Sequence, residues 1–171
     1  MIHRQPAVRE TQGATTLPSR ILLVRLGAIG DVVNALVLAT ALKEHAPTIR
    51  IGWAVHDLAL PLVEGHPSVD RVHLWARSSG FSVLLRVVRD LRGENYALAI
   101  DLQRTAKSAW LARQSGAPRV LGFDRARCKE LSWLLTRERI PASDPRGHMV
   151  AQYLEFAIHS RCGSGRIVRT W

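Results

Sequence analysis

The stretch RILLVRLGAIGDVVN, residues 20–34, is the feature that most restricts how this chain can fold. An apolar run, Ile21–Leu26, passes through a short loop with Gly27 and Gly30 into Asp31 and a helical apolar pattern. A buried strand that leads through glycines into the start of a helix is typical of parallel α/β sheets, where the free N–H groups of the helix form ligand sites. The spacing G-x-x-G-D differs from G-x-G-x-x-G, so the sequence does not predict a dinucleotide site here.

Strand-like and helix-like segments alternate along the rest of the chain. Short apolar runs predict strands over residues 21–26, 49–55, 69–74, 96–101 and 119–122. Helical patterns predict helices over residues 31–45, 56–63, 81–91, 105–114, 131–135 and 148–158. Because such alternation needs crossovers between parallel strands, we expect an α/β fold, a Rossmann-like parallel sheet of five strands with helices on both faces.

The length of 171 residues suits one domain with its own core. Residues 1–19 are polar and basic and lack the apolar stretch of a secretory signal, so we expect a disordered extension, with a transit peptide as the alternative. Residues 20–158 are expected to form the Rossmann-like domain. Residues 159–171 have no periodicity, and we expect an irregular tail left by a truncation or a frameshift. No apolar run approaches the length of a membrane-spanning helix.

The formal net charge of +10 is the main compositional signal, and only three of the 24 basic residues are lysines. Such a balance favours an anionic partner, which includes nucleic acid, an anionic membrane surface, or a phosphorylated or carboxylated substrate. An arginine-rich, solvated surface without a specific partner is the plain alternative. Cys128 and Cys162 have neither metal-ligand nor disulfide spacing, so we expect a reducing cytoplasm and no metal.

Asp31 is the first candidate for chemistry. As an acid at the start of a predicted helix it has an ordinary explanation, because aspartate is a favoured N-cap residue. The functional alternative makes its carboxylate a general base, or the anchor of a substrate hydroxyl, at a loop where Gly30 lets another molecule approach closely.

The segment DLQRTAKS, residues 101–108, follows the fourth predicted strand and holds a second group of candidates. Lys107 falls in the first turn of a predicted helix, where a cation opposes the helix dipole, so helix formation does not favour it. With Arg104 it is able to clamp an anion beside the free N–H groups, while Gln103 and Ser108 are able to hydrogen-bond a polyol. The alternative is a lysine that points into water.

The segment GFDRARCKE, residues 122–130, follows the fifth predicted strand and contains Arg125, Arg127 and Lys129. These cations either extend the anion site at the same edge of the sheet or form a solvated loop. His148 begins a predicted helix, which indicates a cap or a core residue.

Several phrases resemble, in order and spacing, the amino-terminal half of the heptosyltransferases of glycosyltransferase family 9. They are ILLVRLGAIGDVVNALVLATALKEHAP, GHPSVDRVHLW, DLQRTAKSAWLARQSGAPRVLGFDRAR, and ERIP followed by His148. The resemblance covers residues 20–158. It implies a two-domain GT-B glycosyltransferase fold and inverting, metal-independent transfer of a heptose from ADP-heptose to the acidic inner core of lipopolysaccharide. It implies no cofactor beyond this donor substrate.

The resemblance also implies roles for single residues. Asp31 matches the catalytic aspartate of the family, and Lys107 matches the lysine that meets an acceptor phosphate or carboxylate. Arg127 matches an arginine near the acceptor, and Arg104 stands where the family often has glycine. We therefore expect Asp31 to be catalytic, and we expect six residues to bind the acceptor: Lys107, Arg104, Gln103, Ser108, Arg127 and Gly30.

The donor-binding domain of the family is missing from this sequence, so we expect the isolated chain to bind acceptor weakly and to transfer little or no sugar. We expect it in the cytoplasm, in peripheral association with the inner membrane. One alternative is a non-catalytic module that binds an anionic saccharide or lipid. A nucleic-acid partner is not expected, because the tryptophans are spread through predicted core elements rather than interleaved with basic residues.

Overall fold

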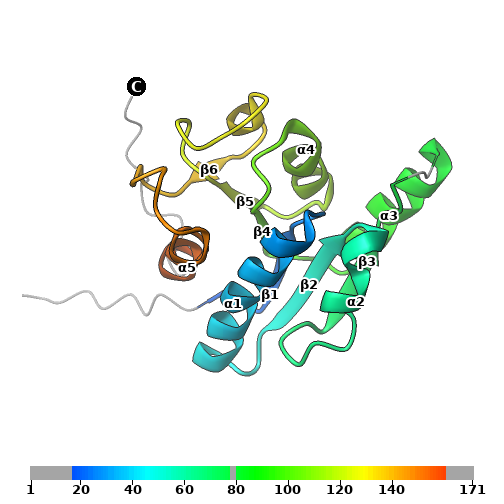
Figure 1. Ribbon diagram of the computed structural model, residues 1–171. Helices are drawn as coiled ribbons and strands as arrows, with labels where there is room; N and C mark the ends of the chain where they lie inside the picture. The colour runs from blue at the N-terminus through cyan, green and yellow to red at the C-terminus, as the bar shows by residue number, and fades with distance from the viewer. Residues whose placement is uncertain (1–16, 78–79, 161–171) are drawn as a thin grey trace, which may run out of the picture.

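The computed structural model describes residues 17–77 and 80–160 of the chain. Its centre is one six-stranded sheet in which all neighbouring strands are parallel, in the order β3-β2-β1-β4-β5-β6 (Figure 1). The strands are β1 (Arg20–Val24), β2 (Arg50–Val55), β3 (Arg71–Leu74), β4 (Leu98–Asp101), β5 (Arg119–Gly122) and β6 (Glu138–Arg139). This order is that of a doubly wound Rossmann sheet, so the predicted fold class is confirmed.

Helices cover both faces of the sheet, as predicted. They are α1 (Ile29–His45), the 3₁₀ turn η1 (Asp57–Ala59), α2 (Leu60–Val63), α3 (Phe81–Gly93), α4 (Ala106–Gln114), the 3₁₀ turn η2 (Ser132–Leu134) and α5 (Met149–His159). Helices α1, α2 and α5 pack on one face, and α3 and α4 pack on the other (Figure 1).

The alternation of side chains along β1 explains the two-sided core. Ile21 and Leu23 are fully buried against the layer of α1 and α5, whereas Leu22 and Val24 are fully buried against α3 and α4. Successive side chains of a strand point to opposite faces, so an unbroken apolar run suits a strand that is covered twice. Each such side chain contributes about 1.5–3 kcal/mol by leaving water.

Three local expectations need correction. The sheet has a sixth strand, because the backbone of Glu138–Arg139 pairs with β5 although its side chains are polar. The predicted helix over 56–63 is divided into η1 and α2. The N-cap of α1 is Ala28, which makes no side-chain cap bond, so the interpretation of Asp31 as an N-cap is wrong.

Other features agree with expectation or fall outside the described residues. His148 caps α5, since its Nδ1 accepts a hydrogen bond from the amide of Val150 at 3.3 Å. Residues 1–16 of the predicted extension and 161–171 of the predicted tail lie outside the described residues, while Leu17 packs against the core. No helix in the described part of the chain is long and apolar enough to cross a membrane.

Candidate functional site

The carboxyl ends of β1 and β4 bring most of the candidates to one edge of the sheet. The two strands are parallel neighbours, and Val24 at the end of β1 lies opposite Asp101 at the end of β4. Asp31 lies in the first turn of the helix that follows β1, and Lys107 in the first turn of the helix that follows β4. The acid and the lysine are therefore delivered to the same edge, as the sequence predicts.

Asp31 is held by a buried arginine that sequence reasoning missed. The Arg25 guanidinium forms an ion pair with the Asp31 carboxylate, and the two side chains are 5% and 39% exposed. Arg25 Nη1 also donates to the carbonyl of Leu102 at 3.1 Å, and the Arg25 carbonyl accepts from Trp53 Nε1 at 3.1 Å. The guanidinium, held by the Leu102 carbonyl, orients the Asp31 carboxylate, which remains partly open to solvent.

Gln103 joins the two loops of the site. The side-chain Oε1 of Gln103 accepts a hydrogen bond at 2.7 Å from the backbone amide of Leu26, which follows β1. The backbone amide of Gln103 donates to Asp101 Oδ1 at 3.0 Å. Asp101 is fully buried, and burial raises its pKa to about 6, against the opposing effect of hydrogen bonds from Ser108 and from the Gln103 and Arg104 amides. The side-chain oxygen of Gln103 is thus used within the protein.

Arg104 adopts a backbone conformation that glycine favours. Its φ of 69° lies in the left-handed region, which gives a physical reason for glycine at this position in the family that the sequence resembles. Its guanidinium carbon lies 5.3 Å from the centroid of the Phe123 ring, and its Nη2 lies 3.8 Å from Met149 Sδ. Its Nε is buried and has no hydrogen-bond partner among the described residues.

Ser108 is not brought to the exposed rim of the site. It is fully buried and forms a capping box with Thr105, in which the Ser108 amide donates to Thr105 Oγ1 at 3.3 Å and the Thr105 amide donates to Ser108 Oγ at 3.2 Å. Its hydroxyl also donates to the Thr105 carbonyl at 3.0 Å. The local role of Ser108 is therefore to begin α4 and so to place Lys107.

Lys107 is exposed and stands over an aromatic ring. Its Nζ lies 4.1 Å from the centroid of the ring of Trp75, the residue that directly follows β3. Trp75 is buried, as core packing predicts, but its role as a support for Lys107 was not predicted. The Trp75 carbonyl accepts a hydrogen bond from His56 Nδ1. The pKa of His56 is lowered, mainly by burial and further by the charges of Lys107 and Arg77, against the opposing effect of its hydrogen bond to the Trp75 carbonyl.

Arg127 is buried, and its guanidinium is used in contacts within the protein. Its Nε forms an ion pair with Asp124, its Nη1 lies 3.0 Å from Glu155, and its Nη2 donates to the Pro141 carbonyl at 2.9 Å. These contacts tie the loop after β5 to α5. Of the neighbouring cations, Arg125 is exposed and its guanidinium carbon lies 4.6 Å from the Trp133 ring centroid.

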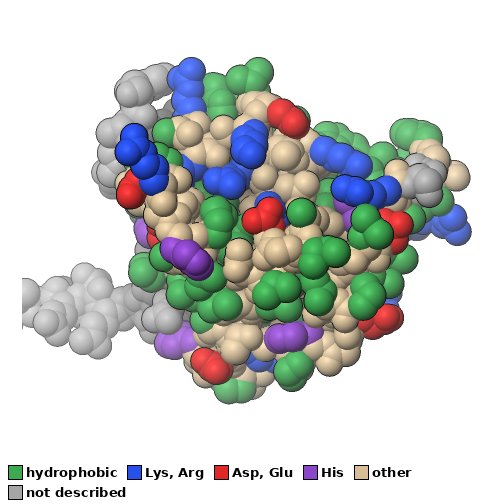
Figure 2. Space-filling model, viewed as in Figure 1, with side chains coloured by type: hydrophobic (Ala, Val, Ile, Leu, Met, Phe, Trp, Pro, Cys, Tyr) green, Lys and Arg blue, Asp and Glu red, His purple; other side chains and the backbone are tan. Residues whose placement is uncertain are grey.

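The surface around the site combines basic and apolar areas. Figure 2 shows basic side chains gathered above α1, towards α4 and the segment after β5, and apolar side chains over α1 itself. The latter include the exposed Ile29, Val33 and Val37. A Cβ added at the exposed Gly30 would meet no atom within 4 Å, so the loop before Asp31 is open. Within residues 17–77 and 80–160, no group of three or more His, Cys, Asp or Glu side chains is arranged to hold a metal ion.

Comparison with known proteins shows which proteins this chain is similar to. Residues 84–164 match glycosyltransferase family 9 (heptosyltransferase). The lipopolysaccharide core heptosyltransferase OpsX of Haemophilus influenzae is 24% identical over 144 residues, which are 84% of this chain and 41% of that protein. Lipopolysaccharide heptosyltransferase 1 of Pseudomonas aeruginosa is 32% identical over 121 residues, which are 65% of this chain and 34% of that protein. The chain spans less than half the length of these curated relatives.

Solved structures agree on the fold. The Escherichia coli heptosyltransferase WaaC with ADP-2-deoxy-2-fluoro heptose matches with a TM-score of 0.72 at 24% identity, over 82% of this chain and 48% of that chain. The E. coli ADP-heptose lps heptosyltransferase II matches with a TM-score of 0.66 at 21% identity, over 88% of this chain and 42% of that chain. The predicted resemblance is confirmed, and the chain is a relative of the heptosyltransferases of family 9.

Proposed function

We propose that this chain, as a relative of the family 9 heptosyltransferases, is the acceptor-binding half of an enzyme that transfers heptose from ADP-heptose to the acidic inner core of lipopolysaccharide. One observation carries the proposal. The half-exposed carboxylate of Asp31 and the exposed ammonium of Lys107 follow neighbouring parallel strands and open at the same edge of the sheet. A base and a cation at the same edge of the sheet suit an acceptor that carries both a nucleophilic hydroxyl and an anionic group.

In the proposed reaction Asp31 acts as general base. The acceptor hydroxyl attacks the anomeric carbon of the donor heptose while the bond from that carbon to the ADP oxygen breaks, and ADP leaves with the electron pair. The Asp31 carboxylate accepts the hydroxyl proton. Attack opposite the leaving group inverts the configuration. The proposal uses no metal ion and no cofactor besides the donor.

The other residues fall into a partly or fully exposed group that contacts the acceptor and a buried group that positions its neighbours. Lys107 is exposed, and we assign it to a phosphate or carboxylate of the acceptor, with Arg104, Gln103 and Gly30 lining the approach. Arg25 orients the base through its ion pair.

Two of the predicted acceptor-binding residues support the site indirectly in this proposal. Ser108 caps α4, and Arg127 fixes the loop after β5 to α5. Both side chains are buried, so we assign them the positioning of neighbours rather than contact with the acceptor.

The location of the enzyme follows from its proposed acceptor, which is anchored in a membrane by its lipid. We propose that the chain works on the cytoplasmic side of the inner membrane and associates with it peripherally. The basic surface above α1 and the exposed apolar side chains of α1 support this proposal, because both are attracted to an anionic lipid surface (Figure 2).

A second candidate is a module that binds an anionic saccharide or lipid without transferring sugar. The short coverage of the relatives, 41% and 34% of their lengths, favours little or no transfer by this chain alone. Separate measurements of acceptor binding and of sugar transfer distinguish the two candidates, because the proposed mechanism needs Asp31 for transfer and not for binding.

The test joins the chain to the carboxyl-terminal part of the P. aeruginosa relative and measures transfer to a delipidated inner-core oligosaccharide. We expect Asp31→Ala to abolish turnover while acceptor affinity, measured by calorimetry, changes little. Lys107→Met is expected to weaken acceptor binding about tenfold, whereas the matched change of an exposed lysine, Lys129→Met, has a smaller effect. Full turnover by the Asp31→Ala fusion contradicts the proposed mechanism.

A further inference from the structure

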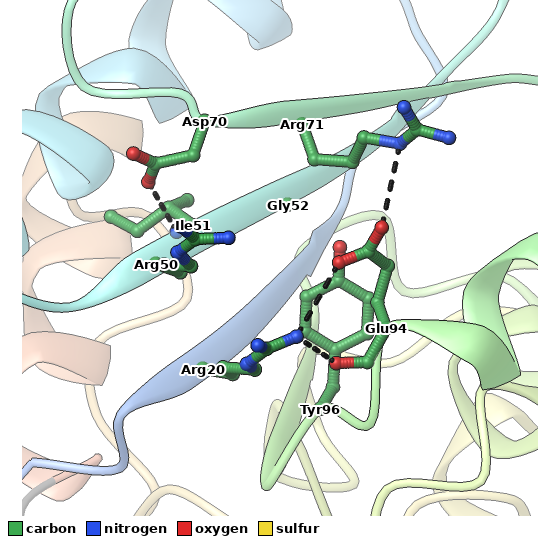
Figure 3. A pocket seen from close by; sticks show the side chains of 8 residues that line it. All are labelled: Arg20, Arg50, Ile51, Gly52, Asp70, Arg71, Glu94 and Tyr96. Carbon is green, nitrogen blue, oxygen red and sulfur yellow. Dashed lines mark hydrogen bonds and ion pairs between the residues drawn. The ribbon is translucent and has the colours of Figure 1, made fainter.

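A polar cavity lies at the edge of the sheet opposite Asp31, at the amino ends of β1, β2 and β3 (Figure 3). Its volume is about 250 Å³. Three arginines line it, one from the first position of each strand. Arg20 and Arg50 lie opposite each other in the register of β1 and β2, and Arg71 lies opposite Gly52 in the register of β2 and β3. Like charges opposite each other on neighbouring strands are destabilising, so folding alone does not favour this arrangement.

The carboxylates of the cavity do not neutralise all three arginines. Asp70 is satisfied by Lys43, whose Nζ lies 2.8 Å away, and by the amide of Ile51 at 2.7 Å. Glu94 lies between Arg20 and Arg71, with its carboxylate 3.6 Å from a nitrogen of each, beyond hydrogen-bond length (Figure 3). Arg20 Nη1 donates instead to the Glu94 carbonyl at 2.7 Å, and Arg71 is paired with Asp90 at 2.9 Å.

Arg50 is the cation that remains available. Within the part of the chain that the structure describes, its guanidinium has neither a hydrogen bond nor an ion pair, and its side chain faces the cavity (Figure 3). A guanidinium with no direct ion pair, on a cavity wall that carries two further guanidinium groups, attracts an anion.

One wall of the cavity is rigid and fits closely. A Cβ at Gly52 would lie 1.8 Å from Tyr96 Oη, so the absence of a side chain at Gly52 makes room for the tyrosine. The Tyr96 hydroxyl lies 2.7 Å from Nε2 of the buried His73, and His73 Nδ1 lies 2.5 Å from Asp90. This chain of contacts holds a polar group at the cavity in one position.

We propose that this cavity binds a small phosphorylated sugar. The guanidinium groups of Arg20 and Arg50 take the phosphate, whose oxygens match their fork of donors. The Glu94 carboxylate, whose contacts with Arg20 and Arg71 are longer than hydrogen bonds, accepts hydrogen bonds from sugar hydroxyl groups, which inorganic phosphate lacks. The volume lies near the lower end of the range for ligand pockets, roughly 300 Å³, so the ligand is a small molecule. The site is independent of the sugar-transfer proposal, because it lies at the other edge of the sheet.

The test is a titration of the full chain with glucose 1-phosphate, followed by amide chemical shifts in ¹H–¹⁵N spectra. Parallel titrations use inorganic phosphate and glucose. We expect saturable shifts at the amides of Gly52, Arg71 and Tyr96 with glucose 1-phosphate, weaker binding of phosphate, and no shifts with glucose.

Variants distinguish this site from the anion site at Lys107. Arg50→Met is expected to weaken binding about tenfold, Arg50→Lys is expected to weaken it less, and the exposed Arg113→Met serves as the matched control with unchanged affinity. Unchanged thermal unfolding of Arg50→Met excludes loss of the fold. The proposal is overturned by shifts confined to the loop of Lys107, by equal affinities for phosphate and glucose 1-phosphate, or by no binding at millimolar ligand.

Discussion

The Lys107 ammonium lies 4.1 Å from the centroid of the Trp75 ring, so a residue of α4 is supported by the residue that follows β3. An exposed cation on an aromatic face gains about 0.5–1 kcal/mol. The contact restricts the lysine without removing it from solvent. Under the proposed function, it orients the ammonium for an acceptor anion and reduces the entropy lost on binding.

This relationship predicts different effects for two substitutions of Trp75. Trp75→Phe keeps an aromatic face, and we expect acceptor affinity within about twofold of the parent chain. Trp75→Leu removes the face, and we expect affinity to fall about threefold to fivefold, since the loss is less than about 1 kcal/mol. Calorimetric titration with the inner-core oligosaccharide measures both. Equal affinities of the two variants would show that the ring does not orient Lys107.

The ion pair of Arg25 and Asp31 predicts an asymmetry in stability. Asp31→Asn leaves the charge of Arg25 buried without its counterion, and we expect the free energy of unfolding to fall by about 1–3 kcal/mol. Urea unfolding measures the change. The double variant Arg25→Met with Asp31→Asn is expected to recover part of the loss, because no buried charge then remains unpaired. Additive losses in the double variant would contradict this account.

The buried carboxyl of Asp101 predicts a pH dependence of stability. Its pKa is raised to about 6 in the folded chain, so the folded state binds its proton more tightly than the unfolded state does. Its contribution is therefore fully present below the unfolded pKa of about 4 and is lost as the pH rises through about 6. We expect Asp101→Asn to be more stable relative to the parent at pH 7 than at pH 4, by about 2 kcal/mol. Urea unfolding across this range tests the prediction, and a pH-independent difference would refute it.

The fit of Tyr96 against Gly52 predicts a strong effect of one added methyl group. A Cβ at Gly52 would lie 1.8 Å from Tyr96 Oη and 2.4 Å from its Cζ, so the ring has to move. We expect Gly52→Ala to destabilise the chain by about 1–3 kcal/mol in urea unfolding. Gly93→Ala is the control, because a Cβ there would meet no atom within 4 Å, and it is expected to be neutral or slightly stabilising.

A substitution of Gly30 is expected to change acceptor affinity without lowering the free energy of unfolding. A Cβ at this position would meet no atom within 4 Å and the position is helical, so Gly30→Ala is expected to leave the free energy of unfolding unchanged or raise it by up to about 1 kcal/mol. The added methyl group narrows the approach to Asp31, and we expect weaker acceptor binding. Calorimetry and urea unfolding of the same preparation test both parts. Unchanged affinity would place the acceptor away from this loop.

The sequence was informative where apolar runs decide the structure. The strand over 119–122 was predicted at its observed bounds, and the helix over 81–91 is longer by only two residues. Strand β6 was missed because Glu138 and Arg139 carry no apolar pattern, and their pairing depends on the backbone of β5. A two-residue strand held only by its neighbour leaves no signal in composition or periodicity.

The edge that holds the site was predictable, but the state of each charged residue was not. Lys107 and Arg127 look alike in sequence as basic residues after strands, yet Lys107 is exposed and Arg127 is buried between Asp124 and Glu155. Glu155 lies 28 residues from Arg127 in the sequence, so no local pattern predicts the ion pair between them. Arg25 was overlooked because it interrupts an apolar run. A charge in such a run, directly before a loop with a candidate acid, is the signal that points to a buried ion pair.

The hydrogen bond from the Leu26 amide to Gln103 Oε1, at 2.7 Å, and the one from Arg25 Nη1 to the Leu102 carbonyl, at 3.1 Å, connect two loops that lie far apart in the chain. A ligand that displaces the loop before Lys107 therefore also displaces the loop before Asp31. Under the proposed function, insertions or deletions in either loop would impair both proton abstraction by Asp31 and acceptor binding by Lys107. Engineering of acceptor preference in this half should therefore vary both loops at once and keep the glutamine that couples them.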